Sequence, residues 1–470
     1  MSPSRALCFA FLVTVCGVPA SADDRPNVLF IAVDDLNHWV GYTGRNGQTL
    51  TPNIDRLSET GVSFTNAHCA APACEPSRAA LMSGLRPSTS ACYKNGDNWR
   101  ELIPRGYSLN AAFKNAGYHV AGMGKIYHSS SGGLDKNFAD EWSEYPAVPR
   151  GSQSGRAKKN WGYHEELPLD MADDDIADYH SVGYFVDKLN EEREEPLFLA
   201  VGLIKPHLPW AVPRKYYDRF PLEEIELPPT RDDDMSDVPL AGRKTGIRTD
   251  HPQFLKSGRW DDAVQSYLAT ISYVDGQIGR LLDGLAASPR AENTIVVLWG
   301  DHGWHLGEKQ RWRKFTLWEE ATRVPLIVSV PGVTPAGTLC DRPVDLMGLF
   351  PTLCDLSGVE TPGHVEGDSW VALLNDPNAA WDGVALTTDG RGRHAVRDGR
   401  WRLIRYQDGS QELYDHDADE YEWTNLADDP AHADVIAELA RHLPDPASEA
   451  PTPERQKKGT KAGNNGGGSK

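Results

Sequence analysis

Short apolar segments rich in β-branched residues alternate along this chain with longer segments of helical periodicity. A helix is predicted over Asp261–Leu285, because its apolar side chains recur on one stripe at helical spacing. Four other segments are apolar almost without interruption, as strands buried on both faces usually are: Asn27–Val33, Leu197–Leu203, Thr294–Trp299 and Val324–Val330. This alternation predicts an α/β fold with a mainly parallel central sheet flanked by helices.

Shorter helices and two long loops complete the predicted N-terminal domain, which we assign to residues 23–367. The polar, Pro- and Gly-rich stretches at 139–172 and 221–258 are predicted to be surface insertions, which in such folds often wall the active site. The shorter helices are predicted at Asn53–Glu59, Leu109–Asn115 and Ile176–Glu192.

The sequence changes in character towards the C-terminus. Short antiparallel strands are predicted at His394–Arg405 and Gln411–Tyr414, followed by a polar helix near Ala431–Leu443. We therefore expect a smaller C-terminal α+β subdomain with an antiparallel sheet over residues 368–447. Residues 448–470 end in a run rich in Gly, Lys and Asn and are predicted to be a disordered tail.

Residues 1–22 have the pattern of a signal peptide. Arg5 supplies a positive charge, an apolar run extends from about Ala6 to Val18, and Ala20-Ser21-Ala22 fits a cleavage site. The apolar run is too short for a good membrane span. We therefore expect an exported protein, either periplasmic or secreted.

Export matters for the seven cysteines, because an oxidising compartment permits disulfides. Cys8 and Cys16 lie in the predicted signal peptide, and Val15 makes Cys16 a poor lipoprotein anchor. Cys340 and Cys354 are fourteen residues apart. They either form a disulfide or remain buried free thiols, and the sequence leaves both possibilities open.

The formal charge of −19 argues against nucleic acid and against an anionic membrane as partners, since both bind basic surfaces. No later segment reaches the ~18 apolar residues of a membrane-spanning helix. An enzyme with an anionic substrate would then need a locally basic pocket inside an acidic surface.

Carboxylates follow two of the predicted strands. Asp34 and Asp35 end the first strand, and Asp301 with His302 follows Thr294–Trp299 after one glycine. In open α/β sheets the ligand crevice lies at the carboxyl ends of the strands. Adjacent buried carboxylates repel each other, so a cation between them is the natural remedy. Two solvated turn aspartates are the alternative for the first pair alone, but the second strand ending favours a metal site.

Several motifs occur in one order along the chain. The first, C-E-P-S-R-A-A-L-M-S-G from Cys74 to Gly84, sets Pro76 and Arg78 at fixed offsets after a cysteine. The others are G-Y-H-V-A-G-M-G-K-I-Y-H at Gly117–His128, K-P-H-L-P at Lys205–Pro209, D-H-G-W-H-L-G-E at Asp301–Glu308, W-R-K-F at Trp312–Phe315 and T-R-V-P-L-I at Thr322–Ile327. With these motifs the chain resembles, over about residues 25 to 440, the type I sulfatases of the alkaline-phosphatase superfamily. It is most similar to their iduronate-2-sulfatase-like branch.

The resemblance implies that a formylglycine-generating enzyme oxidises Cys74 to formylglycine. One hydroxyl of the hydrated aldehyde attacks the sulfur of a sulfate ester, and the second hydroxyl later expels sulfate, which a thiol cannot do. The resemblance also implies one Ca²⁺ per active site, since hard oxygen ligands dominate the matching positions. Because nitrogen is an unusual ligand for Ca²⁺, His302 is expected to be a weak ligand or a sulfate contact. The expected metal ligands are Asp34, Asp35, Cys74, Asp301 and His302.

The matching motifs also carry roles for basic residues. Arg78 lies about one helical turn after Cys74, and its fork suits the formylglycine hydroxyl and a metal carboxylate. Lys125 is expected to contact the formylglycine and a sulfate oxygen. His128 is expected to take the proton from the second hydroxyl.

His207 and Lys314 are expected to bind sulfate and to protonate the departing sugar oxygen. Lys309 is a rival for the role of Lys314, but the W-R-K-F context favours Lys314. The chain departs from the usual signature at Glu75 and Val120, and neither departure touches the residues expected to direct maturation.

The expected substrate is a sulfated saccharide, from a glycosaminoglycan or an algal or other extracellular polysaccharide. A phosphodiesterase or phosphonate monoester hydrolase of the same superfamily is one alternative, and a non-catalytic glycan-binding relative is another. The G-K-x-x-H and K-P-H elements favour sulfate, and retention of all expected chemical groups favours catalysis. Aromatic and basic side chains near the motifs are predicted to line the substrate pocket: His38, Tyr93, Lys94, Trp99, Arg100, His164, Trp304, His305, Arg311 and Trp312.

Overall fold

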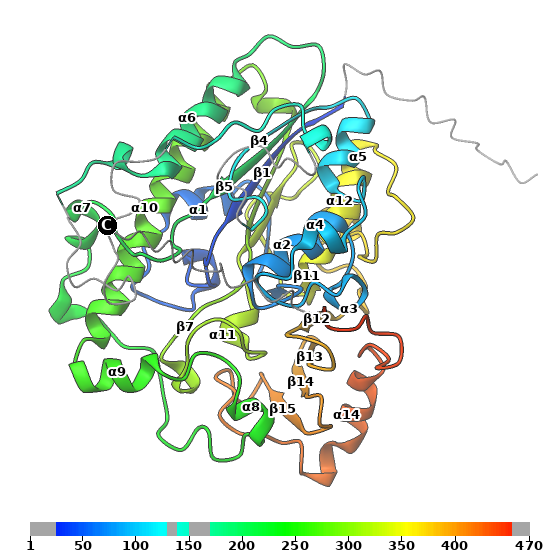
Figure 1. Ribbon diagram of the computed structural model, residues 1–470. Coiled ribbons are helices and arrows are strands. Elements are labelled where there is room, and N and C mark those ends of the chain that lie inside the picture. Colours follow the sequence, from blue (N-terminus) through cyan, green and yellow to red (C-terminus); the bar gives the residue numbers. More distant parts are fainter. Residues whose placement is uncertain (1–24, 129–138, 150–169, 454–470) are drawn as a thin grey trace, which may run out of the picture.

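The computed structural model describes residues 25–128, 139–149 and 170–453. The predicted signal peptide and the candidate His164 lie outside these residues. The central sheet has seven strands in the order β10-β2-β9-β6-β1-β5-β4 (Figure 1). Their bounds are β10 Thr338–Cys340, β2 Val62–Phe64, β9 Leu326–Ser329, β6 Thr294–Gly300, β1 Asn27–Val33, β5 Leu197–Leu203 and β4 His119–Gly124.

Strands β6, β1, β5 and β4 pair in parallel, whereas β9 runs antiparallel to both β6 and β2. The predicted α/β fold with a mainly parallel central sheet is therefore confirmed. The four predicted strands all form, and β9 is shorter than the predicted Val324–Val330.

Helices cover both faces of the sheet. Phe30 of β1 packs on one face with side chains of α2 (Cys74–Ser83), α5 (Leu109–Asn115) and α12 (Leu349–Ser357). Its neighbour Ile31 packs on the other face with α6 (Ala177–Leu189) and α10 (Trp260–Ala286). Figure 1 shows these two groups of helices on opposite sides of the strands. Because successive strand residues point to opposite faces, burial of both faces explains the uninterrupted apolar pattern.

Helix α10 extends the predicted Asp261–Leu285 by one residue at each end, while α6 is shorter than the predicted Ile176–Glu192. Within the described ranges, no helix is long and apolar enough to cross a membrane. The remaining helices are α1 Pro52–Ser58, α3 Pro87–Ser90, α4 Trp99–Leu102, α7 Arg214–Tyr217, α8 Leu240–Arg243, α9 Asp250–Ser257, α11 Glu319–Thr322 and α13 Val371–Asn375. The short strands are β3 Ala67–His68, β11 Val344–Asp345, β7 His305–Leu306 and β8 Trp312–Arg313.

The C-terminal subdomain contains the predicted antiparallel sheet, with four strands where two were expected. The strands pair in the order β12-β13-β14-β15, and α14 (Ala433–Ala440) packs against them (Figure 1). The prediction of one strand over His394–Arg405 is wrong, because a turn divides it. Asp398 Oδ1 accepts from the amide of Arg400 at 2.7 Å and closes that turn. The strand bounds are β12 Ala385–Thr388, β13 His394–Arg397, β14 Trp401–Arg405 and β15 Gln411–Asp415.

The described chain continues in packed form beyond the predicted subdomain boundary. Glu449 is buried, lies 3.2 Å from His394 Nε2 and accepts from the amide of Gly392 at 2.8 Å. Glu449 of the predicted disordered tail is therefore packed, and residues 454–470 of that tail lie outside the described residues. Cys340 and Cys354 are both buried free thiols, so no disulfide joins them.

Candidate active site

Carboxylates emerge from the sheet at the ends of two neighbouring parallel strands. β1 pairs with β6 along its whole length, so Asp34 and Asp35 lie beside Asp301. The amide of Asp35 donates to Asp301 Oδ1 at 2.9 Å, which joins the two strand ends. Asp35 has a φ of 60°, a conformation that non-glycine residues keep where the surroundings impose it, often at functional sites.

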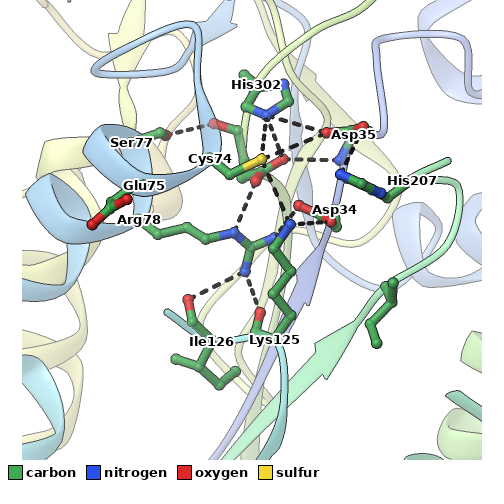
Figure 2. Close-up of polar contacts among 12 residues, drawn as sticks. Asp34, Asp35, Cys74, Glu75, Ser77, Arg78, Lys125, Ile126, His207 and His302 are labelled. Carbon is green, nitrogen blue, oxygen red and sulfur yellow. Dashed lines mark hydrogen bonds and ion pairs between the residues drawn. The ribbon is translucent and has the colours of Figure 1, made fainter. Parts of the chain in front are cut away.

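Cys74 lies at the first position of α2 and faces this carboxylate cluster (Figure 2). Three nitrogen atoms approach its sulfur: Lys314 Nζ at 3.0 Å, His302 Nε2 at 3.3 Å and Lys125 Nζ at 3.6 Å. The cysteine is 1% exposed. Two of these nitrogens belong to lysine ammonium groups, so the position suits an atom that carries or develops negative charge. Burial lowers the pKa of His302 and its Nδ1 lies 3.0 Å from the Gly303 carbonyl, so Nε2 of the neutral ring is free to act as a ligand.

Arg78 holds the strand ends against α2. Its Nε donates to Asp301 Oδ2 at 2.8 Å, and Nη2 donates to Asp34 Oδ1 at 3.2 Å. Nη1 donates to the carbonyl oxygens of Lys125 and Ile126 (Figure 2). The guanidinium therefore contacts two carboxylates and the end of β4, and its expected contact with the residue at 74 is not among these hydrogen bonds.

The two adjacent aspartates have opposite pKa shifts. Burial would raise the pKa of Asp34, but Lys125 and other nearby cations outweigh it and hold that pKa well below its usual value. Burial raises the pKa of Asp35 despite the attraction of His207 and Lys314. Burial would lower the pKa of Lys314, but Asp35 raises it further, so this lysine is a persistent cation.

The donor set fits a divalent cation. Asp34, Asp301, His302 and Cys74 each offer a ligand atom, and these atoms lie within 4.8 Å of one another. Asp35 Oδ2 is buried and has no hydrogen-bond partner among the described residues. Several carboxylate oxygens with an unsatisfied member suit a hard cation such as Ca²⁺.

The two candidate acid–base histidines approach the cluster differently. His207 Nε2 lies 3.8 Å from Asp35 Oδ2, and its side chain is 36% exposed, so it stands at the open edge of the site. Its Nδ1 lies 2.6 Å from the carbonyl of Leu208. His128 is half-buried, and burial together with the charge of Lys125 lowers its pKa, which favours a neutral ring able to accept a proton.

Lys309 does not reach Cys74. Its Nζ donates to Asp234 Oδ1 at 2.8 Å and to the carbonyl of Glu422, at the contact with the C-terminal subdomain. Lys314 is the lysine of this loop that contacts the cysteine, as the sequence context predicts.

Four of the predicted pocket residues are core side chains. His305 donates to or accepts from Thr316 Oγ1 at 2.8 Å, and Trp304 and Trp312 pack in the core on the α10 side of the sheet. The fourth, His38, lies 3.3 Å from Glu320 Oε2 and is fully buried. These side chains support the loop that carries Lys314, and they present no surface that a sugar can reach.

The other predicted pocket residues that the structure describes differ in how exposed they are. Arg311 is buried and donates to the carbonyls of Thr245 and Arg243 at 3.0 and 2.8 Å. Tyr93 and Trp99 are also buried, whereas Lys94 is exposed and Arg100 is half-exposed. Only the last two of these present an accessible polar group.

Three supporting residues were not predicted. The Tyr267 hydroxyl donates to the Asp35 carbonyl at 2.8 Å, although helical periodicity marks this residue only as part of an apolar stripe. Ser77 donates to the Asp301 carbonyl at 2.5 Å, and its place inside the C-E-P-S-R motif was the available signal. Glu75 accepts from the amide of Gly96 at 2.5 Å, so the residue noted as a departure fixes the loop after α3.

The mainly parallel sheet together with the C-terminal antiparallel sheet defines the alkaline-phosphatase-like fold that sulfatase structures share. The sulfatase family matches residues 26–359, and the chain belongs to that family. A second match, to the C-terminal region of N-sulphoglucosamine sulphohydrolase, covers residues 300–449 and includes the antiparallel sheet. The predicted family is therefore confirmed.

Individual relatives support this assignment. A sulfatase of Formosa agariphila is 39% identical over 447 residues, covering 90% of this chain and 87% of that protein. The iduronate 2-sulfatase of Homo sapiens is 31% identical over 397 residues, covering 73% of this chain and 70% of that protein. Sulfatases named for other substrates match as well, so these likenesses do not single out the iduronate branch.

Among solved structures, the phosphonate monoester hydrolase of Agrobacterium radiobacter has a TM-score of 0.72 at 22% identity. The likeness covers 89% of this chain and 94% of that one. At this identity it shows the shared fold.

Proposed function

We propose that this sulfatase hydrolyses sulfate esters of a saccharide, using formylglycine at position 74 as the nucleophile. The observation that carries the proposal is the convergence of Lys314, Lys125 and His302 on Cys74 Sγ. The sulfur stands in for the hydroxyl oxygens of the modified residue. The two lysine ammonium groups would orient the attacking oxygen and stabilise negative charge on the sulfuryl group.

In the first half of the reaction, a hydroxyl at position 74 passes its proton to Asp35, whose Oδ1 lies 3.8 Å from Cys74 Sγ. The hydroxyl oxygen bonds to the ester sulfur as the bond from sulfur to the sugar oxygen breaks. The departing oxygen takes a proton from His207, at the open edge of the site, or from Lys314, which contacts Cys74 Sγ. Arg78 keeps Asp34 and Asp301 in place during this change.

In the second half, His128 accepts the proton of the remaining hydroxyl. The carbonyl of the aldehyde re-forms as its bond to the sulfate oxygen breaks, and sulfate leaves. Water then hydrates the aldehyde, so the net change consumes one ester and one water and yields an alcohol and sulfate. The lowered pKa of His128 suits a group that must be neutral before it accepts this proton.

The carboxylates of Asp34, Asp35 and Asp301 would hold the divalent cation, for which we propose Ca²⁺. When bound, the ion would supply positive charge to a sulfate oxygen and to the hydroxyl at position 74. Asp301→Asn should then lower metal content and activity together, with the fold retained.

A saccharide substrate is supported by the name of the human relative, which specifies a sulfated sugar acid. The particular sugar is left open, because most predicted pocket residues are buried. We also propose export directed by residues 1–22, with maturation by a formylglycine-generating enzyme. Sequencing the N-terminus of exported protein tests the predicted cleavage.

The decisive experiment combines mass spectrometry of the peptide containing Cys74 with parallel assays on sulfate and phosphate esters. We expect the mass spectrum to show loss of sulfur and gain of oxygen at position 74. We also expect faster turnover of sulfate esters than of phosphate esters. Fully active protein with an unmodified thiol at position 74 would overturn the assignment of formylglycine as the nucleophile. Preference for phosphonate or phosphate esters would favour the second candidate, a phosphonate monoester hydrolase, to which the fold is similar.

A further inference from the structure

A cavity of about 240 Å³ lies where the C-terminal subdomain meets the central sheet. Its walls are the chain after β2, the chain after β10 and the turn between β13 and β14. The lining includes Arg323, Arg342 and Arg397, together with Glu319 and Asp341. None of these residues belongs to the cluster around Cys74.

The three arginines have few partners of their own. Among the described residues, their side chains make a single hydrogen bond, from Arg397 Nη1 to the carbonyl of Asp398. Arg397 is 6% exposed, and its Nε has no hydrogen-bond partner. The Nε of Arg342 is likewise buried without a partner. A buried guanidinium N–H group that lacks an acceptor lowers the stability of the folded protein, and a bound acceptor would remove that penalty.

The carboxylate in the cavity wall does not supply that acceptor. Glu319 lies 3.6 Å from Arg323 and 3.7 Å from Arg397, both beyond hydrogen-bond distance, while it hydrogen-bonds Arg402 behind the cavity. Asp341 is exposed. Burial and the like charges of Arg402 and Arg323 lower the pKa of Arg397, although Glu319 opposes them. An added anion would relieve this repulsion.

We propose that this three-arginine cavity is a second anion site, distinct from the active site, which binds a tetrahedral oxyanion of the sulfate or phosphate type. Planar guanidinium groups match two oxygens of such an ion, and three of them can surround it. The cavity holds the volume of about eight liquid waters, which leaves room for the ion and part of its hydration shell.

The oxyanion has two possible sources: free inorganic anion, or a sulfate group on a saccharide chain. Calorimetric titration with sodium sulfate tests the first, and titration with a heparin-derived tetrasaccharide tests the second. Both use the full chain and require no turnover, so a failed sulfatase assay would not affect the result.

The informative variant is Arg342→Gln, because Arg342 is half-exposed and its loss should leave the fold intact. Wild type should bind one more sulfate per chain than this variant, or bind the tetrasaccharide at least tenfold more tightly. Arg397→Gln should act in the same way if it folds. The matched control is Arg391→Gln, which removes an exposed arginine of the same subdomain.

Each result decides the matter. Loss of one sulfate in Arg342→Gln supports a site for free anion, and a selective loss of tetrasaccharide affinity supports a saccharide-bound sulfate. Identical isotherms for wild type, Arg342→Gln and Arg391→Gln, with both probes, would overturn the proposal. An equal loss in the two variants would also overturn it, because it would show general charge attraction.

Discussion

Among the described residues, a comparison of two clusters of buried charge shows that they differ in how their charges are paired. The catalytic cluster surrounds Cys74 at the ends of β1 and β6. The second, which we call the interdomain cluster, consists of Glu319, Arg402, His416 and Glu422, where β14 meets the main domain.

In the interdomain cluster every charge faces an opposite charge. The Nε of Arg402 lies 2.6 Å from Glu422, its Nη2 pairs with Glu319, and His416 lies 3.1 Å from Glu422. The acidic groups and the histidine have the spacing of a metal site. The guanidinium already occupies the place between the two carboxylates, so this cluster is a structural ion pair network.

In the catalytic cluster two lysines pair with carboxylates, and they also converge with a histidine on one sulfur atom. Lys314, Lys125 and His302 all approach Cys74, and Asp35 keeps an unpartnered carboxylate oxygen. The cluster also opens to solvent at His207, whereas Arg402 is almost fully buried. Burial and ion pairing are thus common to both regions, and convergence on a nucleophile distinguishes the site.

Two lysines of one loop offer the sharpest test, and Lys314→Met should have the largest effect. Its Nζ is the cation nearest the Cys74 sulfur, at 3.0 Å. We expect kcat on a sulfate ester to decrease by as much as about 10⁴-fold, the upper end of the range for a positioned acid–base group. Because Asp35 is buried and loses its cation, the thermal unfolding temperature should also fall, so kcat is measured on the folded fraction.

The matched control is Lys309→Met, which removes a lysine of similar burial from the same loop. Its Nζ pairs with Asp234 at the interdomain side, so its loss should cost stability while the folded fraction keeps its kcat. If Lys309→Met lost activity as steeply as Lys314→Met, the distinction between the two regions would fail.

Within the catalytic cluster, His207→Ala and His128→Ala should separate by step, with losses of about 10²–10³-fold. His207 stands at the open edge, so its loss should slow cleavage most for poor leaving groups such as sugar alcohols. His128→Ala should slow release of sulfate, and intact-mass measurement during turnover should show sulfated enzyme. Equal losses on sugar and aryl sulfates, with no trapped adduct, would contradict this division of roles.

The sequence predicts the strand ends and the catalytic motifs well, because each depends on local pattern. A buried strand followed by a carboxylate needs no knowledge of distant partners. The substrate pocket is predicted poorly, because nearness to a motif in the sequence does not define the direction in which a side chain points. The β7–β8 hairpin turns Trp304, His305 and Trp312 inward, where they pack against α10 and neighbouring loops.

The interdomain cluster could not be predicted for a related reason. Arg402 and Glu319 form an ion pair although they are 83 residues apart in the sequence, and no local pattern pairs them. The strand that carries Arg402 was itself merged with β13, since Asp398 and Gly399 lie inside an otherwise strand-like segment. Tertiary partners decide which of many charged residues are buried together.

Arg402→Met tests the interdomain cluster directly. Because it leaves Glu319 and Glu422 buried without their main partner, we expect a loss of about 3–5 kcal/mol in the free energy of unfolding. Denaturant unfolding at neutral pH measures this loss. The activity of the remaining folded protein should match wild type, and a stable variant with lowered kcat would contradict the structural role.

The smallest expected effect is the pH dependence of that loss. Burial would raise the pKa values of Glu319 and Glu422, but Arg402 and nearby cations hold both below the ordinary value of 4.5. In wild type these two groups therefore contribute stability that is present above pH 4.5 and is lost only as pH falls through their lower folded pKa values.

In Arg402→Met, burial acts with less opposition, so the pKa values of the two glutamates should rise above those of the unfolded chain. A carboxyl group with a raised folded pKa destabilises the protein at high pH, and protonation removes that penalty as pH falls. The difference in unfolding free energy between wild type and Arg402→Met should therefore narrow between neutral pH and about pH 5, by about 1.4 kcal/mol for each pKa unit. Paired denaturant titrations across this range measure the difference and cancel the groups that both proteins share. A difference that stays constant or widens towards pH 5 would show that Arg402 acts through packing, and the interdomain cluster would lose its electrostatic explanation.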